Sequence, residues 1–134
     1  MSVQKEPLVV ALGGRVLALD KDTGTELWRN DMHGSGLSWV ALAVSSTCVL
    51  ASASASRVFC IDKFSGATLW TAKTKGIGRA TILLDEGTVF VSKSGWIDCF
   101  NCQTGVLLWS SDVRSVGKGT AALGITNVVI QADG

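Results

Sequence analysis

The sequence has few of the residues on which catalysis, metal binding or membrane insertion usually depends. Its 134 residues contain a single histidine, His33, which leaves no plausible Ser-His-Asp triad and no histidine ligands at zinc-site spacing. No apolar run approaches the length of a membrane span, and residues 1–7 lack the hydrophobic core of a signal peptide. We therefore expect a soluble, cytoplasmic protein that is not an enzyme and does not enter a membrane.

The chain also has no large excess of positive or negative charge. Twelve Lys and Arg against eleven Asp and Glu leave a net charge of +1, and no basic stripe indicates nucleic acid or an anionic membrane as a partner. There is one proline, no low-complexity run and no helix signal, whereas 47% of the residues are hydrophobic and 15 are glycine. At this length the composition indicates one folded, all-β domain at most.

What the chain does contain is one motif, present three times. In each copy an Asp or Asn stands four residues before a Gly and eight residues before a Trp. The copies span residues 14–28, 56–70 and 95–109, so that successive tryptophans are 42 and 39 residues apart. A repeat of about 40 residues with this internal order indicates an array of β units.

Each part of the motif has a structural interpretation. The apolar run before the Asp or Asn suits a strand covered on both faces, and the Asp or Asn oxygen can accept a bond from a backbone N–H two residues on and close a turn. The Gly allows a positive φ, and the Trp would pack between neighbouring units. We therefore assign nine residues to architecture rather than to a site: Asp20, Gly24, Trp28, Asp62, Gly66, Trp70, Asn101, Gly105 and Trp109.

The pattern resembles the PQQ-like β-propeller repeat, whose signature is Ala-x-Asp-x-x-Thr-Gly-x-x-x-Trp. Residues 18–28 match every signature position, the second copy has Cys60 for Ala and Ser65 for Thr, and the third has Cys99 and Asn101. The resemblance covers nearly the whole chain and implies an all-β fold of propeller blades, each of four antiparallel strands around a central channel. Most repeats of this family bind no quinone, so we expect no cofactor.

The repeats divide the chain into two complete blades, at residues 37–73 and 77–113, and two partial ones, at residues 8–33 and 118–134. Rings of this family usually have about six to eight blades, so one chain makes about half a ring. The last unit supplies the first strand of a blade, and the first unit supplies the second, third and fourth strands. One strand is surplus to this count, because residues 8–12 and residues 127–132 both resemble second strands. Either the chain is cut from a longer protein, or two copies form a homodimer that closes a ring. This ring would have six blades, or eight blades if each partial unit forms a blade of its own.

The four cysteines have two interpretations. Cys60 and Cys99 occupy the position of Ala18 and are interpreted as small core residues, as is Cys48 in a neighbouring strand. Cys99 and Cys102 also form a C-x-x-C pair, but there is no second such pair for a zinc site and no pair of adjacent cysteines as in quinoprotein dehydrogenases. Structural thiols are favoured over redox or metal chemistry, and we expect no metal.

The candidate binding residues come from aligning the repeats. Trp39, Arg79 and Lys118 fall at one repeat position, where the innermost strand of each unit begins. The adjacent loops carry His33, Lys73, Lys75 and Arg114. In propellers this end of the strand borders the mouth of the channel. These residues are either a rim that binds an anionic or aromatic-contacting partner, or a solvated rim without such a role.

Three functions therefore remain open. The leading one is a non-catalytic propeller scaffold that closes into a ring and binds another protein or a ligand at the channel face. The second is a fragment of a larger quinoprotein dehydrogenase or sensor, which would need calcium-dependent quinone binding. The third is a sugar-binding propeller that uses Trp39 or Trp96.

Overall fold

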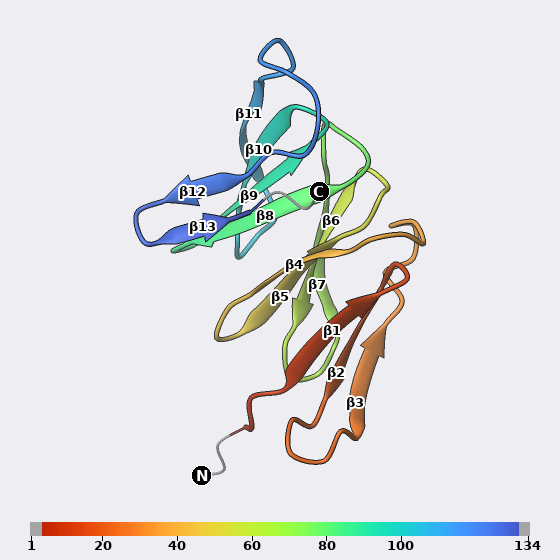
Figure 1. The fold of residues 1–134 in the computed structure, drawn as a ribbon. Helices are drawn as coiled ribbons and strands as arrows, with labels where there is room; N and C mark the ends of the chain where they lie inside the picture. The colour runs from red at the N-terminus through yellow and green to blue at the C-terminus, as the bar shows by residue number, and fades with distance from the viewer. Residues whose placement is uncertain (1–3, 132–134) are drawn as a thin grey trace.

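The computed structural model describes residues 4–131, which form strands and turns without a helix. The strands belong to four antiparallel sheets, here called blades 1 to 4 (Figure 1). Blade 1 contains β1 (Leu8–Leu12), β2 (Arg15–Leu19) and β3 (Glu26–Asn30), and blade 2 contains β4 (Ala41–Val44), β5 (Cys48–Ser52), β6 (Arg57–Asp62) and β7 (Thr68–Lys73). Blade 3 contains β8 (Ala80–Asp85), β9 (Thr88–Lys93), β10 (Trp96–Asn101) and β11 (Leu107–Asp112), and blade 4 contains β12 (Leu123–Ile125) and β13 (Val128–Ile130).

The observed strands follow the repeat pattern. Blades 2 and 3 have all four strands in meander order, and blade 1 lacks the innermost strand that β4 and β8 supply in the complete blades. The last unit holds a short hairpin, and within residues 4–131 its two strands pair only with each other. Residues 132–134 of the predicted last unit lie outside the described part of the chain.

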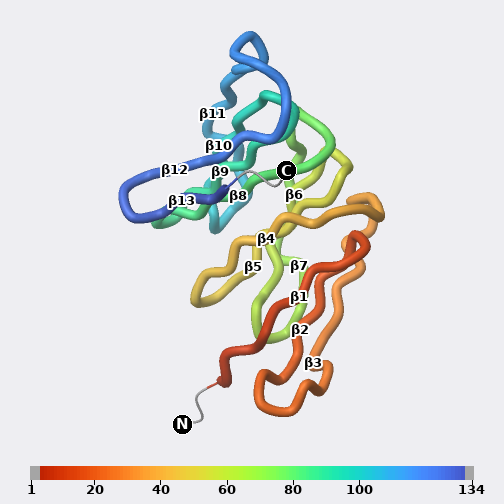
Figure 2. Tube along the Cα trace, in the orientation of Figure 1, coloured from red at the N-terminus to blue at the C-terminus, as the bar shows by residue number. Residues whose placement is uncertain are grey.

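The blades follow one another along the chain, as the tube in Figure 2 shows. The inner strands β4 and β8 are neighbours, and both β12 and β13 lie against β8. The loops that lead into the inner strands and the hairpins between second and third strands are at one end of the blades, where Ala55 N–H donates to the carbonyl oxygen of Ser35 at 2.9 Å. This end carries the candidate rim.

The three motif turns have the same hydrogen bonds. Asp20 Oδ1 accepts from the backbone N–H groups two and three residues on, at 2.8 and 3.1 Å. Asp62 and Asn101 accept the equivalent pairs at 2.9 Å and at 2.9 and 3.0 Å. The turn glycines have φ values of 76° to 79°, a conformation that costs other residues about 1–2 kcal/mol. The interpretation of these residues as turn architecture is consistent with this geometry.

A tryptophan lock joins each blade to the next. In this contact the indole of one blade lies on the turn glycine of the following blade, and its Nε1–H donates to the carbonyl oxygen of the residue after the turn's Asp or Asn. Trp28 Nε1 donates to the carbonyl oxygen of Lys63 at 2.9 Å, and Trp70 Nε1 donates to that of Cys102 at 2.8 Å. A Cβ added at Gly66 would lie 2.6 Å from the Trp28 ring. Glycine is thus needed at this position for space as well as for φ.

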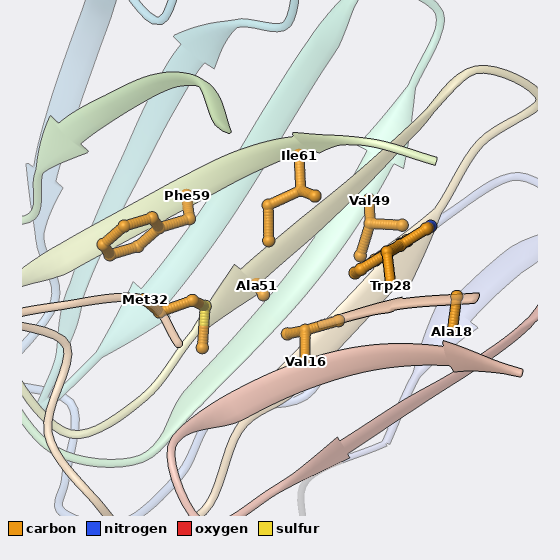
Figure 3. Packing of buried hydrophobic residues seen from close by; sticks show 8 residues of the cluster. All are labelled: Val16, Ala18, Trp28, Met32, Val49, Ala51, Phe59 and Ile61. Atoms are coloured by element: carbon orange, nitrogen blue, oxygen red, sulfur yellow. The ribbon is translucent and has the colours of Figure 1, made fainter. Parts of the chain in front are cut away.

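The core between blades 1 and 2 is built around the first lock. Val16, Ala18 and Trp28 project from blade 1 toward a layer of blade 2 (Figure 3). That layer is made of four buried residues on β5 and β6: Val49, Ala51, Phe59 and Ile61. A second core between blades 2 and 3 includes Val58, Val91 and Phe100. Burial of these faces, at about 25 cal/mol per Å², is the main attraction between blades.

Two buried lysines add polar contacts at the blade junctions. Lys63 Nζ reaches both carboxylate oxygens of Glu6 at 2.7 Å and the carbonyl oxygen of Ser45 at 2.9 Å. Lys93 Nζ, between blades 2 and 3, donates to the carbonyl oxygens of Ala53 and Ala55. Burial lowers the pKa of Lys93 to about 8, against a smaller opposing effect of Asp98.

The lock predicts unequal effects of the same substitution at equivalent glycines. Gly66→Ala should destabilise the chain more than Gly24→Ala, because a Cβ at Gly66 overlaps the Trp28 ring whereas a Cβ at Gly24 meets nothing within 4 Å. The two φ values, 79° and 78°, are matched, so Gly24→Ala should cost only the backbone strain of about 1–2 kcal/mol. Urea unfolding at a protein concentration low enough for the chain to be monomeric measures both, and equal losses would contradict the lock.

The buried lysine predicts a pH dependence. The unfolded chain holds a proton on Lys93 up to its ordinary pKa of 10.5, whereas the folded chain releases it near pH 8. Since the unfolded state then binds more protons, the contribution of Lys93 to stability rises as pH increases from about 8 to 10.5. The difference in unfolding free energy, wild type minus Lys93→Met, should therefore increase as the pH is raised across this range. Lys21→Met, at an exposed lysine, is the control, and a constant difference for Lys93→Met would refute the shift.

Candidate binding rim

The structure brings two of the aligned rim residues into contact. Trp39 lies two residues before β4 and Arg79 one residue before β8, and the inner strands of blades 2 and 3 are neighbours. The Arg79 guanidinium carbon stands 3.9 Å from the centroid of the Trp39 ring. Trp39 is still 64% exposed, so the stack is a surface feature. A cation over an indole at an exposed site contributes about 0.5–1 kcal/mol.

The third aligned residue, Lys118, shares a pocket with Arg79. This pocket has a volume of about 440 Å³ and lies where the β9–β10 hairpin meets the loop between β11 and β12. Its charged lining residues are Arg79, Arg114 and Lys118, with glycines and hydroxyl side chains between them. A second pocket of about 180 Å³ runs from Trp39 and Arg79 along β4 and β8 to Gln131. Arg79 lines both pockets, so that the three aligned residues border two adjoining hollows.

Arg114 is a rim residue that the repeat alignment did not select. Its guanidinium carbon lies 4.8 Å from the centroid of the Trp96 ring, and its Nε and Nη2 donate to the two carboxylate oxygens of Asp112 at 2.8 and 2.7 Å. These bonds hold the pKa of Asp112 at about 2. Sequence reasoning places Arg114 only in a loop adjacent to the rim, and the structure shows that it lines the same pocket as Lys118.

His33 does not join the other candidates. It is exposed in the loop between β3 and β4, and it is not among the residues that line the two rim pockets. Sequence alignment of the repeats grouped Trp39, Arg79 and Lys118 by equivalent position, whereas His33 was added only because its loop is adjacent. The candidate rim is therefore Trp39, Arg79, Arg114 and Lys118.

Three of the four cysteines, Cys48, Cys60 and Cys102, lie at the junction of blades 2 and 3 rather than at the rim. Cys48 and Cys60 are buried in that core, and Cys102 packs against it from the third turn. The Cys60 thiol lowers the pKa of Cys48, while Cys48 raises the pKa of Cys60, and burial raises that of Cys102 to about 11. All four thiols are free. Small residues that fill a core are consistent with the preferred structural interpretation.

Two further observations concern metal sites and membrane-spanning helices in the described residues. Residues 4–131 contain no group of three or more His, Cys, Asp or Glu side chains placed to hold a metal ion. The same residues include no helix with the length and apolarity needed to cross a bilayer.

Comparisons with known proteins agree with this architecture. The family model described as outer membrane protein assembly factor BamB matches residues 12–134. BamB from Moraxella catarrhalis is similar in structure at 29% identity with a TM-score of 0.65, over 79% of this chain and 33% of that one. The chain thus spans about one third of the length of BamB. No curated protein matches significantly.

Two more distant structures show the fold alone. The computationally designed Ika4 protein has a TM-score of 0.78 at 23% identity, over 97% of this chain and 81% of that one. Quinohemoprotein alcohol dehydrogenase from Comamonas testosteroni has a TM-score of 0.63 at 19% identity, over 79% of this chain and 19% of that one. Together with the three turns, the two locks and the family match, they lead to one conclusion: the chain belongs to the PQQ-like β-propeller repeat family described as outer membrane protein assembly factor BamB.

Proposed function

We propose that the chain is part of a non-catalytic scaffold whose blades close into a ring, and that its rim binds an acidic segment of another protein at the channel face. The observation that carries this proposal is the Arg79–Trp39 stack beside a pocket whose charged lining residues are all cations. Together, Arg79, Arg114 and Lys118 give the pocket the positive charge that a carboxylate-bearing partner would meet.

The chemistry of these side chains favours carboxylates over neutral ligands. The planar guanidinium of Arg79 can donate two parallel bonds to one carboxylate, and its orientation is set by the stack on Trp39. The exposed remainder of the Trp39 ring offers an apolar surface next to that charge. Neighbouring cations in a concave surface also raise the local concentration of anions and speed their association.

The family supports a role in assembly. Its description names an assembly factor, which is a protein that acts on other proteins, although this chain spans only one third of BamB. We extend that role to the present chain as part of the proposal. A cytoplasmic location stays a prediction, to be checked by cell fractionation.

Binding of an acidic peptide tests the proposed rim. A fluorescein-labelled hexaglutamate peptide should bind at low salt in fluorescence anisotropy, and hexalysine should not. Arg79→Gln should weaken hexaglutamate binding about tenfold, as the loss of a charged hydrogen bond does. Arg79→Lys should restore only part of the affinity, because it keeps the charge but loses the planar fork. The control is Arg29→Gln, which makes the same charge change on the outer strand β3.

Several outcomes would overturn this function. Equal weakening by Arg79→Gln and Arg29→Gln would show that only net charge is sensed. Binding of a neutral oligosaccharide that is lost in Trp39→Ala, without hexaglutamate binding, would favour a sugar-binding propeller instead. Calcium-dependent binding of pyrroloquinoline quinone would favour a segment of a quinoprotein.

A further inference from the structure

One half of a tryptophan lock is left open at the end of blade 3. Trp109 stands at the motif position of Trp28 and Trp70, but its indole is 47% exposed whereas that of Trp28 is 8% exposed. The leucine that precedes each of these tryptophans is similarly exposed in all three blades, at 52%, 56% and 51% for Leu27, Leu69 and Leu108. The residue beside the tryptophan is therefore equally exposed in the three blades, whereas the tryptophan itself is not.

The other half of a lock is open at the start of blade 1. The turn from Asp20 to Gly24 has the hydrogen bonds of the other two motif turns, and Gly24 has the same φ. Trp28 and Trp70 cover Gly66 and Gly105, whereas no atom lies within 4 Å of the Cβ position of Gly24. The carbonyl oxygen that corresponds to the two lock acceptors is that of Lys21, directly after Asp20.

We propose that the open halves meet between two copies of this chain. The Trp109 indole of one copy would lie on Gly24 of the second copy, with Nε1–H donating to the carbonyl oxygen of Lys21. The same contact would form in the other direction, so that two equivalent seams close a ring. This inference specifies the ring closure in the proposed function and rests on that part of it.

The faces around the two halves are suited to each other. On blade 1, cross-strand pairs on the face opposite the Trp28 core are apolar, Leu8 with Leu19 and Val10 with Leu17. On blade 3, Phe90 lies beside Trp109 with ring centroids 6.0 Å apart. Packing these faces together would bury apolar surface as the two internal junctions do.

The lock also decides the number of blades. If Trp109 meets Gly24, then blade 1 of the second copy directly follows blade 3 of the first, and the ring has three full blade positions per copy, six in total. Blade 1 lacks an inner strand beside β1, whose other edge is open among residues 4–131. The β12 segment of the first copy would pair with that open edge of β1 in the second copy. The β13 strand of the first copy would be displaced, since β1 of the second copy becomes the second strand of this blade.

The oligomeric state of the 134-residue chain, measured by analytical ultracentrifugation, tests the seam. The wild type should be a dimer, and Trp109→Ala should raise the dimer dissociation constant at least ~30-fold, as the loss of a hot-spot tryptophan does. Gly24→Ala should have a similar effect, because its Cβ would occupy the place of the indole. Leu108→Ala is the matched control and should remain dimeric. Circular dichroism of the monomeric variants should be unchanged, since both half-sites are open within one chain.

Mixing the two variants separates a seam from misfolding. A heterodimer of Trp109→Ala with Gly24→Ala has one doubly altered seam and one intact seam, so the mixture should associate more strongly than either variant alone. A monomeric wild type, open polymers, dimeric Trp109→Ala or no gain on mixing would each overturn the proposal. Hexaglutamate binding to the rim is measured separately, so failure of the seam and failure of the rim give different results.

Discussion

The contact between an indole and a turn glycine is the interaction on which the arrangement of this protein depends. Each of the two locks combines an aromatic ring, buried for Trp28 and half-buried for Trp70, with a hydrogen bond from Nε1 and a turn that only glycine can complete. The lock relates sequence-distant residues, Trp28 to Gly66 and Trp70 to Gly105, and so fixes how each blade is rotated and spaced against the next. The apolar faces attract neighbouring blades to each other, and the lock adds a directional contact to that attraction.

The rim depends on these contacts although it shares no residue with them. Trp39 and Arg79 belong to different blades, and they can stack only if blades 2 and 3 are held at the spacing that the second lock and the buried Lys93 maintain. A binding surface made from equivalent positions of successive repeats is a consequence of this regular spacing. The same regularity places Lys118 beside Arg79, in the next repeat along.

Much of the architecture could be predicted from the sequence because the repeat is local. The strands and turns follow from apolar runs, an Asp or Asn and a Gly within about 15 residues, and the three turns indeed have equivalent hydrogen bonds. The equivalence of Trp39, Arg79 and Lys118 came from the same spacing. Arg114 could be placed only in a loop near the rim, because its contacts with Trp96 and Asp112 depend on the path of a loop that does not follow the repeat.

The sequence by itself determined the blade, the turn and the family, since each of these is written in short stretches of chain whose local preferences agree. Only the tertiary structure decided that Trp28 is buried while Trp109 is not, and that Gly24 is open while Gly66 is covered. The motif is identical in kind at all three positions, so no local pattern distinguishes them. What differs is the neighbouring blade, and a residue's burial depends on what is packed against it rather than on the residues beside it in the chain.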